Sequence, residues 1–279
     1  MKVLGIDIGG SGIKGAPVDT QRGTLLAERH RIPTPQPATP AAVARVVGEV
    51  ARHFRWRGPI GCAFPAVIKN GVVQTAANVD ESWIGVNGAK LFSRSTKCPV
   101  LLLNDADAAG VAEVQFGRGK GHKGVLLLLT LGTGIGSALF VNGVLVPNTE
   151  LGHAEVDGKD AEKRGSEQAK KKHGLSWKDW AKEVNKVLAT METLLSPDRI
   201  ILGGGVSAKY DHYMKYLKSR AEIVPAKLEN DAGIVGAALI DQHVLAQGVS
   251  GRSSSAKKAT RRAPPRAARR AAQKGRRRS

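Results

Sequence analysis

Two aspartates, Asp105 and Asp107, stand directly after a short apolar run at 100–103. The run is bounded by a proline and by Asn-Asp, which predicts a buried strand, and a strand end holds the next side chain rigidly. A carboxylate in that position can accept the proton of an alcohol while its oxygen attacks a phosphoryl group. Capping of the following helix is the alternative for one of the two acids, but it does not easily explain both.

Three glycine-rich turns each follow an apolar segment that predicts a strand. They consist of Gly9, Gly10, Ser11 and Gly12, of Gly132, Thr133 and Gly134, and of Gly203, Gly204 and Gly205. Glycine lets backbone amides approach phosphate oxygens without a Cβ clash, Lys14 adds positive charge, and Asp7 at a strand end can hold Mg²⁺ through water. A plain hairpin turn at 9–12 and a strand-to-helix turn at 203–205 are the alternatives.

A further group of polar residues gathers around Glu150 and His153, with Glu155 and Glu162 downstream. Carboxylates and imidazole exchange hydrogen bonds with hydroxyl groups, so these residues around one polar cleft suit a sugar ring. A purely structural role for His153 is the alternative. Trp83 has two interpretations, stacking on a sugar or packing in the core.

The elements that position these residues alternate between strands, glycine turns and helices, which indicates an α/β protein. The predicted strands are 2–8, 24–29, 60–64, 100–103, 125–131 and 200–202, and the predicted helices are 43–54, 104–116, 177–195 and 232–246. Within the apolar segment 137–146, Asn142-Gly143 predicts the turn of a hairpin. The strand-turn-strand opening of the chain recurs at 125–146, which indicates two related lobes with ligand in the cleft. We expect a small N-terminal lobe at 1–104 completed by a closing helix at 231–249, a larger lobe at 105–230, and a tail at 250–279.

The chain has 279 residues, 42% of them hydrophobic, and a formal net charge of +19. Nine arginines and three lysines without any acidic residue lie at 251–279. The basic character therefore belongs mainly to a tail that lacks large apolar residues and is expected to be disordered, which argues against a nucleic-acid-binding domain. Cys62 and Cys98 form no CxxC pair, and no secretion signal or membrane span is recognisable, so a reduced, cytoplasmic setting is expected.

Seven stretches of the sequence together resemble the ROK family of sugar kinases, and within it the polyphosphate glucokinases of actinobacterial type. They are LGIDIGGSGIKGAPVD, RIPTPQPATP, TAANVDESWIG, NDADAAG, LLTLGTGIGSALFVNGVLVPNTELGHAEVDGKDAEKR, ILGGGVS and AGIVGAA. These stretches span roughly residues 3–240, and the NTELGH and VDGKDAEKR portions are the most specific.

The resemblance implies an α/β, actin-like (ribonuclease H-like) fold of two lobes. It assigns Asp105 as the catalytic base, and it assigns five residues to the sugar, namely Asn78, Asn104, Glu150, His153 and Glu162. Residues 9–14 and 132–134 match the phosphate loops, and 203–205 matches the turn on the adenosine side. The three cysteines of the usual ROK zinc cluster are absent, so no zinc site is expected.

The implied reaction transfers a phosphoryl group from polyphosphate, from ATP or from both to the 6-hydroxyl of glucose, with Mg²⁺ as cofactor and a homodimer as the expected assembly. An ATP-only hexokinase is the alternative within the family. A polyanion- or nucleic-acid-binding protein that retains a kinase body, and an actin-like phosphatase, are the alternatives outside it. The basic tail would attract polyphosphate or RNA without sequence preference, since no aromatic residue interleaves its charges.

Overall fold

The computed structural model describes residues 1–77 and 79–240. Asn78, the predicted tail at 250–279 and most of the second half of the predicted closing helix lie outside the described residues. The division of the chain at 104 and 230 into two lobes remains a prediction.

The first sheet carries the first glycine turn and the strand that leads to Asp105. Its strands are β1 (Lys2–Ile8), β2 (Ile13–Asp19), β3 (Thr24–Leu25), β4 (His30–Ile32), β5 (Ile60–Phe64) and β8 (Val100–Asn104). The order is β3-β2-β1-β5-β8, and β4 also pairs with β2. Strands β1 and β2 form an antiparallel hairpin, whereas β5 and β8 run parallel to β1.

The second sheet repeats this arrangement. Its strands are β9 (Val125–Leu131), β10 (Ile135–Val141), β11 (Val144–Val146), β14 (Arg199–Gly203) and β15 (Glu222–Pro225), in the order β11-β10-β9-β14-β15. Again a hairpin opens the sheet, and two parallel strands follow on the other side of its first strand. The predicted recurrence of the strand-turn-strand unit is confirmed.

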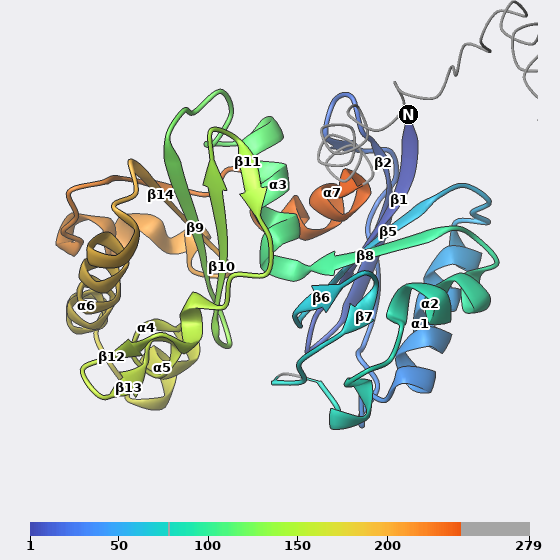
Figure 1. Ribbon diagram of the computed structural model, residues 1–279, viewed down its shortest axis with the longest axis horizontal. Helices are drawn as coiled ribbons and strands as arrows, with labels where there is room; N and C mark the ends of the chain where they lie inside the picture. The colour runs from blue at the N-terminus through green and yellow to red at the C-terminus, as the bar shows by residue number, and fades with distance from the viewer. Residues whose placement is uncertain (78, 241–279) are drawn as a thin grey trace, which may run out of the picture. The chain divides into compact units, whose positions relative to one another are not determined.

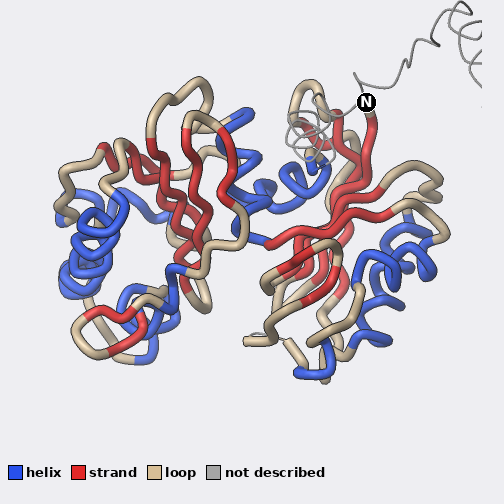
Figure 2. Tube along the Cα trace, in the orientation of Figure 1, coloured by secondary structure: helices blue, strands red, loops and turns tan. Residues whose placement is uncertain are grey.

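Helices separate and flank the two sheets (Figures 1 and 2). They are α1 (Pro40–His53), α2 (Gly88–Thr96), α3 (Asp105–Phe116), α4 (Ala161–Gly165), α5 (Glu167–Lys172), α6 (Trp177–Leu195) and α7 (Ala232–Ala238). Two further pairs of short strands are β6 (Ile68–Lys69) with β7 (Val72–Val73) and β12 (Glu155–Val156) with β13 (Lys159–Asp160). Helices α3 and α7 lie between the sheets, α1 and α2 pack on the first sheet, and α6 packs on the second.

Close packing of α7 fixes α3 against the first sheet. A Cβ atom at Gly61 of β5 would lie 1.8 Å from the Ala237 carbonyl oxygen, and one at Gly236 would lie 1.7 Å from the Ala108 carbonyl oxygen. Only glycine allows the α7 backbone to touch both the strand and α3. The N-terminus of α3, which begins at Asp105, therefore holds a set place beside the first sheet.

Most long predicted elements are confirmed, and the shorter ones account for the errors. The helix predicted at 177–195 is α6, and the hairpin predicted at Asn142-Gly143 is confirmed, since β10 and β11 flank this pair and both residues have positive φ. The strand predicted at 24–29 is wrong beyond Leu25, because Leu26 is 45% exposed and gains little from continuing the strand. Within the described residues no helix is both long and apolar enough to span a membrane.

Candidate functional site

A cavity of about 460 Å³ collects residues from both glycine hairpins. Eleven of the residues predicted for the site line it: Gly9, Gly10, Asn104, Asp105, Gly132, Thr133, Gly134, Glu150, His153, Glu162 and Gly204. Asp7, Lys14, Gly203 and Gly205 line an adjoining cavity of about 250 Å³, which shares Asp105, Thr130 and Gly204 with the first. Ser11 and Gly12 line neither cavity, although they belong to the same turn as Gly9.

Asp105 lies where the two cavities meet. Its Oδ1 accepts a hydrogen bond from the Ala106 N–H at 2.8 Å, and its Oδ2 accepts none from the described residues. Burial and then the negative charge of Asp7 raise the pKa of Asp105 to about 7, against the opposite effect of the Ala106 N–H. A carboxyl with such a pKa can take up and release a proton near neutral pH.

Asp107 has a different role from Asp105. It is 2% exposed, and its Oδ2 accepts the Asn148 N–H at 2.8 Å. Burial raises its pKa to about 7, and its Oδ1 is buried without a hydrogen-bond partner among the described residues. Neither aspartate is the N-cap residue of α3, because the Asn104 side chain accepts the N–H groups of Ala106 and Asp107. Asp105 shares the Ala106 N–H with Asn104, whereas Asp107 has no part in the cap.

Asn104 also connects the helix cap with Glu150. Its Nδ2 donates to the Ala66 carbonyl at 3.2 Å and to Glu150 Oε1 at 3.4 Å. Burial raises the pKa of Glu150, and the nearby Glu162 raises it too, whereas His153 lowers it.

Ser137 supports the loop that carries Glu150, since its hydroxyl donates to the Thr149 carbonyl at 2.6 Å and accepts the Leu151 N–H at 3.0 Å. Sequence reasoning missed Ser137, which carries no motif of its own.

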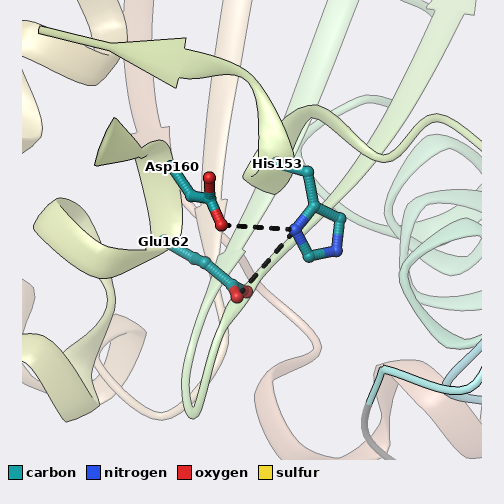
Figure 3. Close-up of side chains that lie close together, drawn as sticks. All are labelled: His153, Asp160 and Glu162. Atoms are coloured by element: carbon teal, nitrogen blue, oxygen red, sulfur yellow. Dashed lines mark ion pairs between the residues drawn. The ribbon is translucent and has the colours of Figure 1, made fainter. Parts of the chain in front are cut away.

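Two carboxylates face one nitrogen of His153 (Figure 3). Its Nδ1 lies 4.0 Å from Asp160 Oδ2 and 4.0 Å from Glu162 Oε1, while the other ring nitrogen points away from both. The ligand atoms of the three residues lie within 4.8 Å of one another, an arrangement that can hold a metal ion. Lys163 lies 3.2 Å from Asp160, so that carboxylate already has a cationic partner. Sequence reasoning missed Asp160, although it stands two residues before Glu162.

The first glycine turn is a hairpin turn that neighbouring segments support. Asp7 and Lys14 are direct cross-strand partners, and their side chains form an ion pair at 3.3 Å. The Arg31 guanidinium donates to the Ser11 carbonyl at 2.8 Å, and the Thr34 hydroxyl donates to the Gly9 carbonyl at 2.5 Å. The hairpin alternative is thus correct for the backbone, and it leaves this turn at the edge of the cavity.

The second glycine turn brings Glu162 into the site. A Cβ atom at Gly134 would lie 2.4 Å from Glu162 Oε2, so a larger residue there would displace this carboxylate from its observed position. The Gln168 N–H, at the start of α5, donates to the Gly132 carbonyl at 3.1 Å. The third turn lies against the second, because Gly204 has φ of +80° and a Cβ atom there would lie 2.7 Å from the Leu131 carbonyl oxygen.

Trp83 is a core residue, which rules out the interpretation of sugar stacking. It is fully buried between Phe64 and Phe92, and its Nε1 donates to the Ala38 carbonyl at 2.8 Å.

Comparisons with known proteins agree with this architecture. The chain matches the ROK family over residues 3–169 and 157–244. It is 52% identical over 241 residues to a polyphosphate glucokinase of Mycobacterium tuberculosis, covering 85% of this chain and 89% of that protein. It resembles the crystal structure of inorganic polyphosphate/ATP-glucomannokinase from Arthrobacter sp. strain KM with a TM-score of 0.84 and 48% identity, covering 88% of this chain and 99% of the other.

A more distant structure supports the fold alone. A ROK family glucokinase from Streptomyces griseus, solved with glucose and AMPPNP, matches with a TM-score of 0.75 at 22% identity, covering 86% of this chain and 99% of the other. The predicted actin-like α/β fold is confirmed by these matches. With the family matched over most of its length and relatives about half identical in sequence, the chain belongs to the ROK family.

Proposed function

We propose that this protein is a polyphosphate glucokinase, which transfers a phosphoryl group from inorganic polyphosphate, and also from ATP, to the 6-hydroxyl of glucose. The observation that carries the proposal is Asp105, a carboxyl with a pKa raised to about 7 that opens onto a cavity between two glycine turns. The 52% identity to the mycobacterial polyphosphate glucokinase supports the donor and the acceptor.

The sugar takes the part of the cavity lined by Glu150, His153 and Glu162. These side chains come from one short stretch that packs on β10, and they present two carboxylates and one imidazole to the cavity. Such groups accept and donate hydrogen bonds to several hydroxyls at once, which orients the ring. We propose that Asn104 acts through Glu150, since its amide bonds that carboxylate. The proposed contact of Asn78 lies outside the described residues.

Asp105 acts as the general base. It accepts the proton of the 6-hydroxyl as the bond between that oxygen and the terminal phosphorus forms. The bond from this phosphorus to the bridging oxygen of the donor breaks, and the shortened donor leaves with the extra negative charge. Lys14 and the backbone amides of the two glycine turns stabilise the charge on the transferring group.

Asp7 is the residue that fits Mg²⁺, which it would hold through water. It offers carboxylate oxygens, the donors that Mg²⁺ prefers, and its charge is felt strongly enough at Asp105 to raise the pKa of Asp105. A bound Mg²⁺ supplies positive charge to the phosphates of the donor. We also propose a homodimer and a cytoplasmic location, as the resemblance implies.

Formation of glucose 6-phosphate by the purified protein tests the proposal. The reaction is run with glucose, Mg²⁺ and either ATP or long-chain polyphosphate, and product is measured with glucose-6-phosphate dehydrogenase. Product with polyphosphate supports the proposed donor, and product with ATP alone makes the protein an ATP-dependent hexokinase. The absence of product with both donors would refute the proposed kinase activity.

A further inference from the structure

Three further cavities share lining residues with the central one, and they differ sharply in charge. The cavity beside Gly203–Gly205 contains Lys14 but also Asp7, Asp105, Glu113 and Glu229. The cavity beside the first glycine turn, of about 360 Å³, has Asp80 as the ionisable residue of its described lining. The third, of about 420 Å³, is rich in lysine, which sets it apart from the other two.

We call this third cavity the basic groove and define it by Lys159, Lys163, Lys172 and His173. It joins the central cavity at Thr133 of the second glycine turn and at Glu162. The lysines come from three successive elements, β13, α4 and α5, so the local fold arranges them around one hollow. Ser166 and Gln168 add polar groups to the lining.

Two of the lysines are available to a ligand. Lys163 pairs with Asp160 at 3.2 Å, whereas neither Lys159 nor Lys172 has a carboxylate within ion-pair distance among the described residues. Both side chains are exposed. Unpaired ammonium groups around a hollow attract an anion, and the attraction grows with the number of charges that the anion carries.

We propose that the basic groove binds the distal phosphates of a long polyphosphate chain whose terminal phosphate lies at Thr133. The inference rests on the proposed function and adds a second binding region to it. A polyphosphate chain extends beyond the reacting phosphate and must leave the central cavity on one side. The cavity beside Gly203–Gly205 has four carboxylates and one lysine in its lining, whereas the basic groove has three lysines, so the groove is the more favourable place for the phosphates beyond the reacting one.

The same geometry separates the two donors. ATP carries three phosphates, and the family resemblance puts its adenosine beside the third glycine turn, so we expect ATP to make no use of Lys159 or Lys172. A polyphosphate of many units reaches the groove, whereas tripolyphosphate is too short to fill it. Loss of the lysines should therefore impair long chains selectively.

The test compares two variants that lose the same charge. In the first, Lys159→Gln is combined with Lys172→Gln. In the control, Lys178→Gln is combined with Lys182→Gln, which are exposed lysines on α6 outside the groove. KM is measured for long-chain polyphosphate, tripolyphosphate, ATP and glucose in the full chain. The basic segment at 251–279 is present in every protein, so differences between variants do not come from it.

We expect the groove variant to raise KM for long-chain polyphosphate by about tenfold, roughly threefold for each lysine, since exposed ion pairs contribute up to about fivefold each. KM for ATP, tripolyphosphate and glucose should stay within twofold. The slope of log KM against log salt concentration should decrease by about 1.4, because each lost contact to a single-stranded polyanion removes about 0.7 from that slope. An unchanged KM for the long chain, or an equal rise in the α6 control, would overturn the proposal.

Hydrogen–deuterium exchange separates this inference from the proposed function. Long-chain polyphosphate should protect peptides from 157–173 in the parent protein and not in the groove variant. If the parent protein makes no product from polyphosphate but shows this protection, the groove is real and the proposed donor is wrong. If product forms and peptides from 157–173 show no protection, the donor is right and the groove proposal fails.

Discussion

Asp105→Asn and Asp107→Asn are the same chemical change two residues apart, and we expect only the first to impair catalysis. Burial raises the pKa of both carboxyls to about 7. Asp105 lines the cavity, whereas Asp107 is 2% exposed and accepts the Asn148 N–H. An amide oxygen can still accept that N–H, but an amide cannot take a proton from an alcohol.

The expected loss for Asp105→Asn is about 10²- to 10⁴-fold in kcat, the usual contribution of a general base. Its KM for glucose should stay within a few fold, because the sugar contacts remain. Asp107→Asn should keep kcat within about threefold. Initial rates of glucose 6-phosphate formation, measured over a range of glucose concentrations with each donor, give both constants.

The pH profile provides a second readout. With a pKa of about 7, Asp105 is ionised to about 9% at pH 6 and about 91% at pH 8, so kcat/KM should rise about tenfold across this range. Asp107→Asn should keep this rise, and the residual activity of Asp105→Asn should lose it. If Asp105→Asn retains more than about a tenth of kcat, or Asp107→Asn loses as much activity, Asp105 is not the base.

Thermal unfolding shows whether a lost activity is merely lost folding. Because the pKa of each carboxyl is raised in the folded protein, the folded state binds more protons than the unfolded state between about pH 4 and 7. The stability from these protons is present at pH 4 and is lost as the pH rises through 7. Each asparagine variant should therefore have a higher Tm than the parent protein at pH 8, with a smaller difference at pH 5. A lower Tm at pH 8 would contradict the assigned burial.

Three further predictions concern the sugar site and the donor. Asp160→Asn removes a carboxylate that faces His153, and it should raise KM for glucose about three- to tenfold at constant kcat. The control Asp157→Asn, in the same loop, should change neither KM nor kcat. Equal effects of the two variants would show that Asp160 does not position His153. Gly134→Ala should raise KM for glucose about tenfold by displacing Glu162, whereas Gly132→Ala, whose Cβ meets no described atom within 4 Å, should change KM for the donor instead. Deletion of 251–279 should raise KM for long-chain polyphosphate at low salt and not KM for ATP, and equal KM values would show that this segment does not recruit the donor.

Periodicity and turn chemistry were sufficient for the long elements. Strand β9 and helix α6 have the predicted bounds. An unbroken apolar run defines β9, and apolar residues at helical spacing after the Ser176 cap define α6. Strand β2 was missed because Gly15 and Pro17 interrupt its pattern. The glycine is required by packing, since its Cβ would lie 2.6 Å from Val50 on α1. A constraint from a distant helix cannot be recognised from local propensity.

The candidate site divides in the same way. Residues with a chemical motif, such as Asp105, Glu150 and His153, could be selected from the sequence and do line one cavity. The residues that hold them could not, because Ser137 and Asp160 act through contacts with segments that only the fold brings near. Trp83 could not be decided from the sequence, because its residue type suits both a sugar and the core, and its burial places it in the core.

Under the proposed function, the repeated topology accounts for a donor held between two similar turns, with polyphosphate and ATP extending from them in different directions. Each sheet opens with a seven-residue strand, a glycine turn and a second seven-residue strand, so both turns end on the same cavity. The surroundings differ, because the first turn is followed by the Pro-rich connection to α1 and the second is covered by α4 and α5 with their lysines. In this proposal the two hairpins hold the reacting phosphate of any donor. The segments that follow the second hairpin determine which donors can bind beyond that phosphate.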